Sequence, residues 1–201
     1  MGRGWRVAEN APDRVGERER GRVGSPAEGK TGLRLWLPGY HTPSLNVTKG
    51  GHWKQYHGLK QAAARALMRA LLDAGFSMLD GGQQALLVLD AIAQGGKLGK
   101  RGELIRLAAK QEAERMKIQT RRLGDEERVR TLLAFTRVTC QPLDVENFCG
   151  STKALTDCLR LAFPAWLPDD APEFVEIRHA QVKCGRRCEE GTWVELRLGQ
   201  E

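Results

Sequence analysis

The sequence predicts an α/β (α+β) fold in which a small β-sheet is flanked by helices. Runs with the alternation or the β-branched and aromatic content of strands stand near both ends of the ordered chain, and helical runs lie between them. The chain has 201 residues, of which 41% are hydrophobic and 28% charged. This composition is sufficient for the packed core of one ordinary domain with additional segments.

Four segments are predicted to be strands. They are LRLWL (33–37), VRTLLAFTRVTC (129–140), FVEIRHAQVKC (174–184) and TWVELRL (192–198). The last two are separated only by the turn CGRRCEEG, so we expect them to form a hairpin.

Four other segments are predicted to be helices, because helix formers and apolar residues recur at helical spacing. They are 53–74, 83–94, 102–122 and TKALTDCLRLAF (152–163). The stretch GGKLGKRG between the second and third helices is expected to be a loop.

The first 31 residues are rich in Gly, Arg and Glu and predict a disordered basic leader before a domain at 32–201. No apolar run approaches the roughly 20 residues that span a bilayer, and no apolar stretch follows the early arginines as in a secretory signal. We therefore expect a cytoplasmic protein that does not insert into membranes.

The formal net charge is +7, and the segment 95–122 carries nine cations against three anions. This bias favours a polyanionic partner such as DNA. The alternative is a solvated helix face with internal charge pairs. Few aromatic residues stand in this segment, which argues against an RNA-binding or membrane-surface role.

Five cysteines, an odd number, indicate free thiols in a reducing compartment. Cys184 and Cys188 in CGRRC also suggest zinc. No second close pair accompanies them, and His52 or His57 would have to complete the site through long-range folding. We therefore interpret the cysteines as packed or surface thiols.

Acidic residues gather between the second and third predicted strands, on both sides of the helix 152–163. Asp144 and Glu146 are two positions apart at the end of a strand, so their side chains are expected to point the same way. Asp169 and Asp170 precede the next strand, and the acids would converge at one sheet edge if the two strands are neighbours. Such carboxylates suit Mg²⁺ or Mn²⁺ and phosphodiester cleavage, with Lys153 holding a phosphate. Helix capping and turn formation explain the same acids without a metal.

The motifs DVEN (144–147), KALTD (153–157) and PDDAP (168–172) occur in an order that resembles the RusA family of Holliday junction resolvases. LWLPGYHTPSLN and GGHWKQYHGLK resemble the front end of that family. The resemblance covers roughly 33–74 and 129–198. It implies a small mixed sheet and a homodimeric, bacterial or phage-encoded endonuclease that nicks four-way DNA junctions symmetrically in recombination and repair, with Mg²⁺ as cofactor.

Carried over by position, the resemblance implies that Asp144, Glu146 and Asp170 bind the metal and that Lys153 is the essential basic partner. Residues expected to contact DNA are Lys49, His52, Lys54, Lys110, Arg115, Lys117 and Arg137. Glu146 departs from the usual Asp, the residues 150–152 lengthen the gap before Lys153, and the helical segment 75–125 is an insertion. A non-catalytic DNA-binding protein on the same scaffold is the competing hypothesis.

Overall fold

The computed structural model describes residues 32–42, 53–77, 82–123 and 129–198. The leader predicted for 1–31 lies outside the described residues. The described helices and strands are β1 (Gly32–Pro38), α2 (Trp53–Asp73), α3 (Gln83–Gln94), α4 (Gly99–Arg122), β2 (Thr131–Thr139), α5 (Val145–Ser151), α6 (Lys153–Ala162), β3 (Val175–Lys183) and β4 (Gly191–Leu198), with short 3-10 turns at Gly95–Leu98 and Arg187–Glu189. The fold is α+β, which confirms the predicted class.

The four strands form one mixed sheet in the order β1–β4–β2–β3. β4 is antiparallel to β1 and β2, whereas β2 and β3 are parallel. The predicted hairpin at 174–198 is therefore wrong, because β2 lies between β3 and β4. Leu133 and Phe135 of β2 are completely inaccessible to solvent, and this strand takes the interior position, paired on both sides. The connection 184–190 joins β3 to β4 across two strand spacings, about 10 Å. The alternation within these two strands does not reveal that β2 lies between them.

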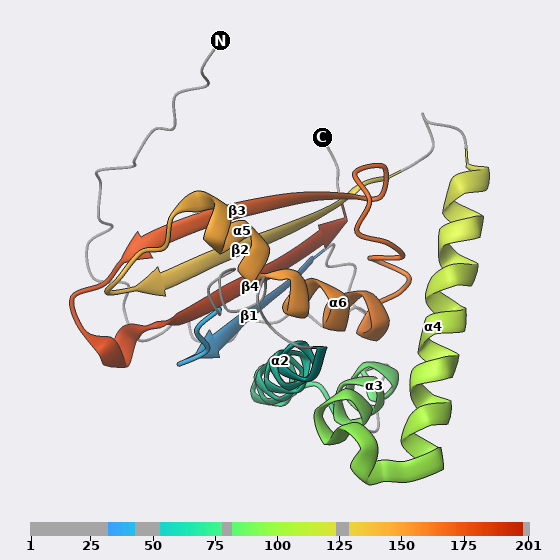
Figure 1. The fold of residues 1–201 in the computed structure, drawn as a ribbon. Coiled ribbons are helices and arrows are strands. Elements are labelled where there is room, and N and C mark those ends of the chain that lie inside the picture. Colours follow the sequence, from blue (N-terminus) through green and yellow to red (C-terminus); the bar gives the residue numbers. More distant parts are fainter. Residues whose placement is uncertain (1–31, 43–52, 78–81, 124–128, 199–201) are drawn as a thin grey trace.

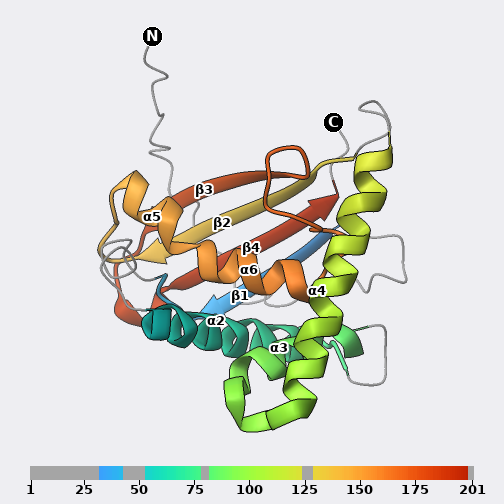
Figure 2. The ribbon, with the colours of Figure 1, turned by 45° about the vertical axis from the view of Figure 1, so that its right-hand side comes forward.

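The helices cover one face of this sheet (Figures 1 and 2). α2 packs against β1 and α6, and α3 and α4 form an outer layer against α2 and α6. The core between these layers includes Leu35, Leu67, Leu89, Phe135 and Leu155, each nearly or fully inaccessible. Leu155 belongs to the apolar face of α6 that the sequence predicts. Because α3 contributes to the same core, the segment 75–125 is packed into the domain and does not form a separate lobe.

The predicted helices correspond to α2, α3, α4 and α6, but the glycine-lysine stretch is only partly a loop. A 3-10 turn spans Gly95–Leu98, and α4 begins at Gly99. Gly95 and Gly99 have φ angles of 59° and 52°, a left-handed conformation that glycine adopts without a steric penalty. These two glycines reverse the chain tightly enough for α4 to pack back against α3.

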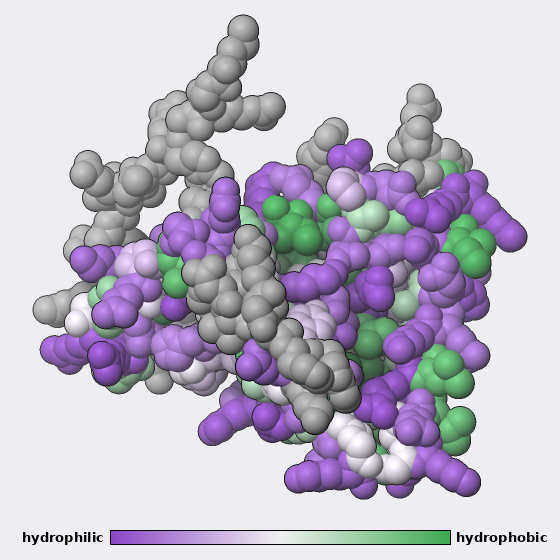
Figure 3. Space-filling model, in the orientation of Figure 1, coloured by the Kyte–Doolittle hydropathy of each residue, from purple (hydrophilic) through white to green (hydrophobic). Residues whose placement is uncertain are grey.

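Two properties of the helices concern their apolar surface. Within the described ranges, no helix has both the length and the apolar character needed to cross a bilayer. Figure 3 shows apolar patches separated by hydrophilic side chains on the side of the molecule where α4 lies. Exposed apolar residues of α4 include Leu104, Leu107 and Ile118.

Candidate catalytic cleft at the start of helix α6

Asp144 and Glu146 do not lie on a strand. Asp144 is the N-cap of α5, with φ −62° and ψ 159°, and its Oδ1 accepts a hydrogen bond of 2.8 Å from the backbone N–H of Asn147. The Asn147 side chain donates a second hydrogen bond to the same carboxylate. Glu146 is in the first turn of α5. The expected common direction of Asp144 and Glu146 is therefore wrong, because positions two apart on a helix are separated by about 200°.

Lys153 and Asp170 form the centre of the site. The Lys153 ammonium is bonded to Asp170 and lies 3.2 Å from Asp157 Oδ1, one helical turn further along α6. The Lys153 side chain is 52% exposed and that of Asp170 29%. Burial opposes the charge of Lys153, but its hydrogen bond to Asp170 and the charges of Asp157 and Asp170 outweigh this effect and raise its pKa. Lys153 therefore stays protonated and is accessible to a ligand.

Asp157 ties this centre to helix α2. Its Oδ2 accepts hydrogen bonds from Tyr56 Oη at 2.7 Å and from Lys60 Nζ at 2.9 Å. Burial favours the protonated carboxyl, but the hydrogen bonds from Tyr56 and Lys60 prevail and hold the pKa of Asp157 below its usual range. Asp157 is thus an ionised support that fixes the Lys153 side chain.

Asp169 and Asp170 are adjacent but have different surroundings. Asp169 is buried, and its carboxylate binds Arg160 Nη1 at 2.9 Å and Lys117 Nζ at 2.6 Å. It also accepts the backbone N–H of Asp170 at 2.8 Å. Burial acts to raise the pKa of Asp169, yet the bond from Lys117 and the backbone N–H of Asp170 lower it far below its usual range. Asp169 therefore anchors the turn and leaves Asp170 to face Lys153.

The position of Asp170 beside Lys153 does not arise from the strand arrangement that the sequence predicts. β2 and β3 are neighbours, but they are parallel, with Thr131 opposite Val175. Asp144 follows the end of β2 and Asp170 precedes the start of β3, so these two acids flank opposite ends of the strand pair. Asp170 reaches the start of α6 because the segment 163–170 folds back along that helix.

A cleft of about 450 Å³ opens beside the Lys153–Asp170 pair. Tyr56, Thr152 and His179 also line it. His179 stacks on Phe135 with ring centroids 5.7 Å apart, and its Nε2 lies 2.9 Å from Thr152 Oγ1. Burial lowers the pKa of His179, so its ring is neutral at neutral pH.

Sequence reasoning did not select His179 as a site residue. The Thr152 hydroxyl donates to the backbone carbonyl of Cys149 at 3.0 Å, so it accepts from the Nε2–H of His179. The remaining nitrogen, Nδ1, lies 3.5 Å from Cys149 Sγ. The signal available in the sequence was the alternation of β3, which places His179 on the same side as the inward-facing Val175 and Ile177.

The predicted metal ligands match Mg²⁺ in kind but not in placement. Asp144, Glu146 and Asp170 offer carboxylate oxygens, the donors that Mg²⁺ prefers. However, no three acids among the described residues place their ligand atoms within 4.8 Å of one another. Asp170 is bonded to Lys153, while Asp144 and Glu146 are exposed on α5. The structure thus brings together Lys153, Asp157 and Asp170, and leaves Asp144 and Glu146 on the neighbouring short helix.

The residues predicted to contact DNA have several different environments. Lys49 and His52 lie outside the described residues, and Lys54 is in the first turn of α2. Arg137 is only 8% exposed, because it is on the inward side of β2, so its guanidinium is not presented to a duplex. Lys110, Arg115 and Lys117 are on α4, of which Lys110 and Arg115 are exposed. Arg115 is paired with Glu112 at 2.8 Å and Lys117 with Asp169, so part of the expected basic face is neutralised within the molecule.

A larger hollow of about 760 Å³ lies among α2, α4 and α6. Its lining includes Lys60, Lys100, Leu104, Leu107 and Lys110. Among the described residues that line it, Glu103 is the one acid, beside cations and apolar side chains, and no carboxylate–lysine pair like that of the smaller cleft is found there. We therefore place the candidate chemistry in the smaller cleft, despite its smaller volume.

Comparison with known proteins adds no relative: no protein-family model, curated protein or solved structure matches this chain. The resemblance to the RusA family consequently remains a hypothesis carried by short motifs. The functional argument depends on the geometry of the cleft.

Proposed function

We propose that this protein is a Mg²⁺-dependent endonuclease that resolves four-way DNA junctions by paired symmetric nicks. The observation that carries this proposal is the Lys153–Asp170 pair at the mouth of the cleft, partly exposed and supported by Asp157 and Asp169. A protonated lysine beside an accessible carboxylate supplies a phosphate contact and a hard oxygen donor at one place. The motif order that resembles RusA resolvases points to branched DNA as the substrate.

Each residue of the cleft has a defined part in this proposal. Lys153 holds a phosphate oxygen of the DNA, and Asp157 keeps its ammonium in place. Asp170 provides a carboxylate at the cleft mouth. Asp144 and Glu146 lie outside the cleft lining and would add carboxylates once α5 moves toward Asp170. Mg²⁺ or Mn²⁺, when bound, would activate water and stabilise the leaving oxygen.

A non-catalytic DNA-binding protein is the second candidate, and one observation favours it. Asp144 and Glu146 are not gathered with Asp170, and the Glu146 side chain makes no hydrogen bond or ion pair with the described residues. A scaffold that retains the basic surface but no longer assembles its carboxylates would bind junctions without cutting them.

Two further expectations belong to the nuclease proposal. Symmetric nicking requires two active sites, so we propose a homodimer. The described helices all cover one face of the sheet, and the other face, which carries Leu132, Ala134 and Val182, is available to a second copy. We also place the activity in the reducing cytoplasm of a bacterium or of a phage-infected cell.

The test uses a labelled four-way junction and a linear duplex of the same arm sequence, each with and without Mg²⁺. We expect paired nicks in the junction only, dependent on Mg²⁺, and lost in Asp170→Asn and Lys153→Gln. Asp90→Asn is the matched control, since Asp90 lies on α3 away from the cleft and from the open sheet face and accepts a hydrogen bond from Gln94 at 3.3 Å. Junction binding without cleavage in Mg²⁺ or Mn²⁺ would establish the second candidate, and binding to neither DNA would reject both.

A further inference from the structure

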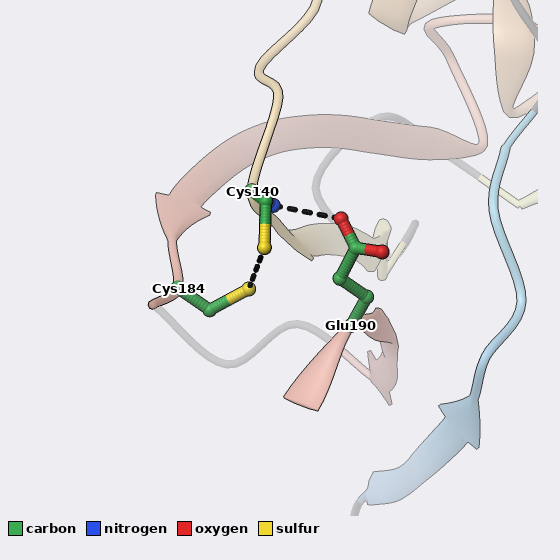
Figure 4. A group of neighbouring side chains, drawn as sticks. All are labelled: Cys140, Cys184 and Glu190. Atoms are coloured by element: carbon green, nitrogen blue, oxygen red, sulfur yellow. Dashed lines mark hydrogen bonds between the residues drawn. The ribbon is translucent and has the colours of Figure 1, made fainter. Parts of the chain in front are cut away.

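Two thiols and a carboxylate meet at a second place, at the opposite end of β3 from Asp170 (Figure 4). Cys140 follows β2 and Cys184 follows β3, whose last residues Thr139 and Lys183 are register partners. The two sulfur atoms are 3.5 Å apart, and both cysteines are free. Glu190 immediately precedes β4, and one ligand atom from each of the three residues lies within 4.8 Å of the other two. The cluster thus depends on the order of the strands, which places three separate chain segments side by side.

The backbone holds Glu190 in this position. Its Oε1 accepts the N–H of Cys140 at 2.8 Å and the hydroxyl of Thr139 at 3.1 Å. Its other oxygen, Oε2, lies 3.7 Å from Nε2 of His41, a residue that follows β1. Four groups of metal-ligating type, one from the end of each strand, are therefore concentrated at one corner of the sheet.

Two of the separations match a tetrahedral site. Cys140, Cys184 and Glu190 form its compact part, and His41 approaches the site only through the carboxylate of Glu190. Zn–S bonds of about 2.3 Å place two cysteine sulfurs about 3.8 Å apart, and Zn–N and Zn–O bonds of about 2.1 Å place those ligand atoms about 3.4 Å apart. The observed separations are 3.5 Å for the sulfurs and 3.7 Å for His41 and Glu190. We propose that Cys140, Cys184 and Glu190 bind a thiophilic divalent cation, Zn²⁺, and that the His41 ring turns toward the ion as the fourth ligand.

The charges near the site agree with this assignment. Two thiolates and a carboxylate bring three negative charges against the two positive charges of the ion. Arg137 is buried and close enough to Glu190 for their charges to interact. Its guanidinium balances the remaining negative charge. This charge balance explains why an arginine is buried near the end of β2.

This site is distinct from the catalytic cleft in residues and in chemistry. Sulfur and imidazole ligands select Zn²⁺ over Mg²⁺, whereas the acids of the cleft are hard oxygen donors. A bound ion would tie the ends of all four strands together, since each ligand comes from a different strand terminus. Its role is therefore structural, and it does not depend on the nuclease proposal.

The test is a titration of the full-length protein with Co²⁺, after chelation and in the presence of a non-thiol reductant. We expect one Co²⁺ per chain with the sulfur-to-cobalt charge-transfer absorption of a thiolate site, displaced by Zn²⁺, and a higher melting temperature in Zn²⁺. The absence of this absorption in the folded, reduced wild-type protein would overturn the proposal. So would a mass-spectrometric finding that Cys140 and Cys184 form a disulfide and the reduced protein binds no metal.

Single substitutions assign the ligands. Cys140→Ser and Cys184→Ser should each weaken Zn²⁺ binding at least about tenfold, and His41→Ala should weaken it as well. Cys149→Ser is the matched control, because Cys149 is an exposed thiol beside His179 and outside the cluster, and it should bind like wild type. If Cys188→Ser weakens binding and His41→Ala does not, the assignment of His41 is wrong. Circular dichroism of each variant separates loss of a ligand from loss of the fold.

Discussion

Asp169 and Asp170 are adjacent acids for which we expect the same substitution to have different effects. Asp169→Asn should lower the stability of the fold, and Asp170→Asn should abolish cleavage. In Asp169→Asn, a side chain that is 11% exposed loses its charge against Lys117 and Arg160. A hydrogen bond to a charged group contributes about 1.5–3 kcal/mol, and breaking a buried ion pair costs about 3–5 kcal/mol. Asparagine keeps an oxygen for the Asp170 N–H, so we expect the free energy of unfolding to fall by about 3 kcal/mol. For a chain of this size that corresponds to a melting temperature lower by about 6–12 °C.

Asp170→Asn is the matched control. Both partners of the Asp170–Lys153 pair are substantially exposed, and such pairs contribute about 1 kcal/mol or less. We therefore expect a nearly unchanged melting temperature in Asp170→Asn, combined with the loss of cleavage. Thermal unfolding followed by circular dichroism measures both variants under the same conditions.

The pH dependence gives an independent check on Asp169. Its pKa in the folded protein is far below the ordinary value of 3.8, so the stabilisation is fully present above about pH 4–5 and is lost as pH falls toward the folded pKa. The difference in stability between wild type and Asp169→Asn should be constant near neutral pH and should shrink below about pH 4. A melting temperature of Asp169→Asn equal to wild type at pH 7, or equal drops in both variants, would refute the assignment of Asp169 as the buried anchor.

Three other predictions concern the acids of α5 and the basic surface of α4. Asp144→Asn should melt like wild type, because asparagine caps a helix as well as aspartate does, but should lose junction cleavage; a retained cleavage rate would remove Asp144 from the site. If Glu146 contributes a carboxylate, Glu146→Asp keeps part of the activity and Glu146→Gln loses it, so equal wild-type rates in both would exclude it. Four exposed cations of α4 have no ion-pair partner among the described residues: Lys100, Arg101, Lys110 and Arg122. Their joint replacement by Gln should flatten the salt dependence of junction binding by up to about 0.9 log units per lost phosphate contact, whereas Arg115→Gln, already neutralised by Glu112, should change it little.

The sequence by itself determined most of the secondary structure and the fold class. The helical spacing of apolar residues located α2, α3, α4 and α6 because each helix buries one face against the same core. Alternation and β-branched or aromatic content located the strands, because each strand buries one face of the sheet against the helices. Helical spacing also placed Lys153 beside Asp157, since the i and i+4 positions of a helix are adjacent whatever the remainder of the chain does.

The tertiary structure alone decided which strands are neighbours and which side chains meet. Local patterns report burial and turn formation, but strand pairing depends on contacts between segments far apart in sequence. The position of β2 between β3 and β4 therefore could not be predicted from the strand sequences. The direction of that pairing places Asp144 and Asp170 at opposite ends of the two strands, and a backbone turn places Asp144 on a helix. The same pairing brings Cys140 beside Cys184, two thiols separated by more than forty positions in the sequence. Proximity of this kind is a property of the strand order, which no single stretch of the sequence encodes.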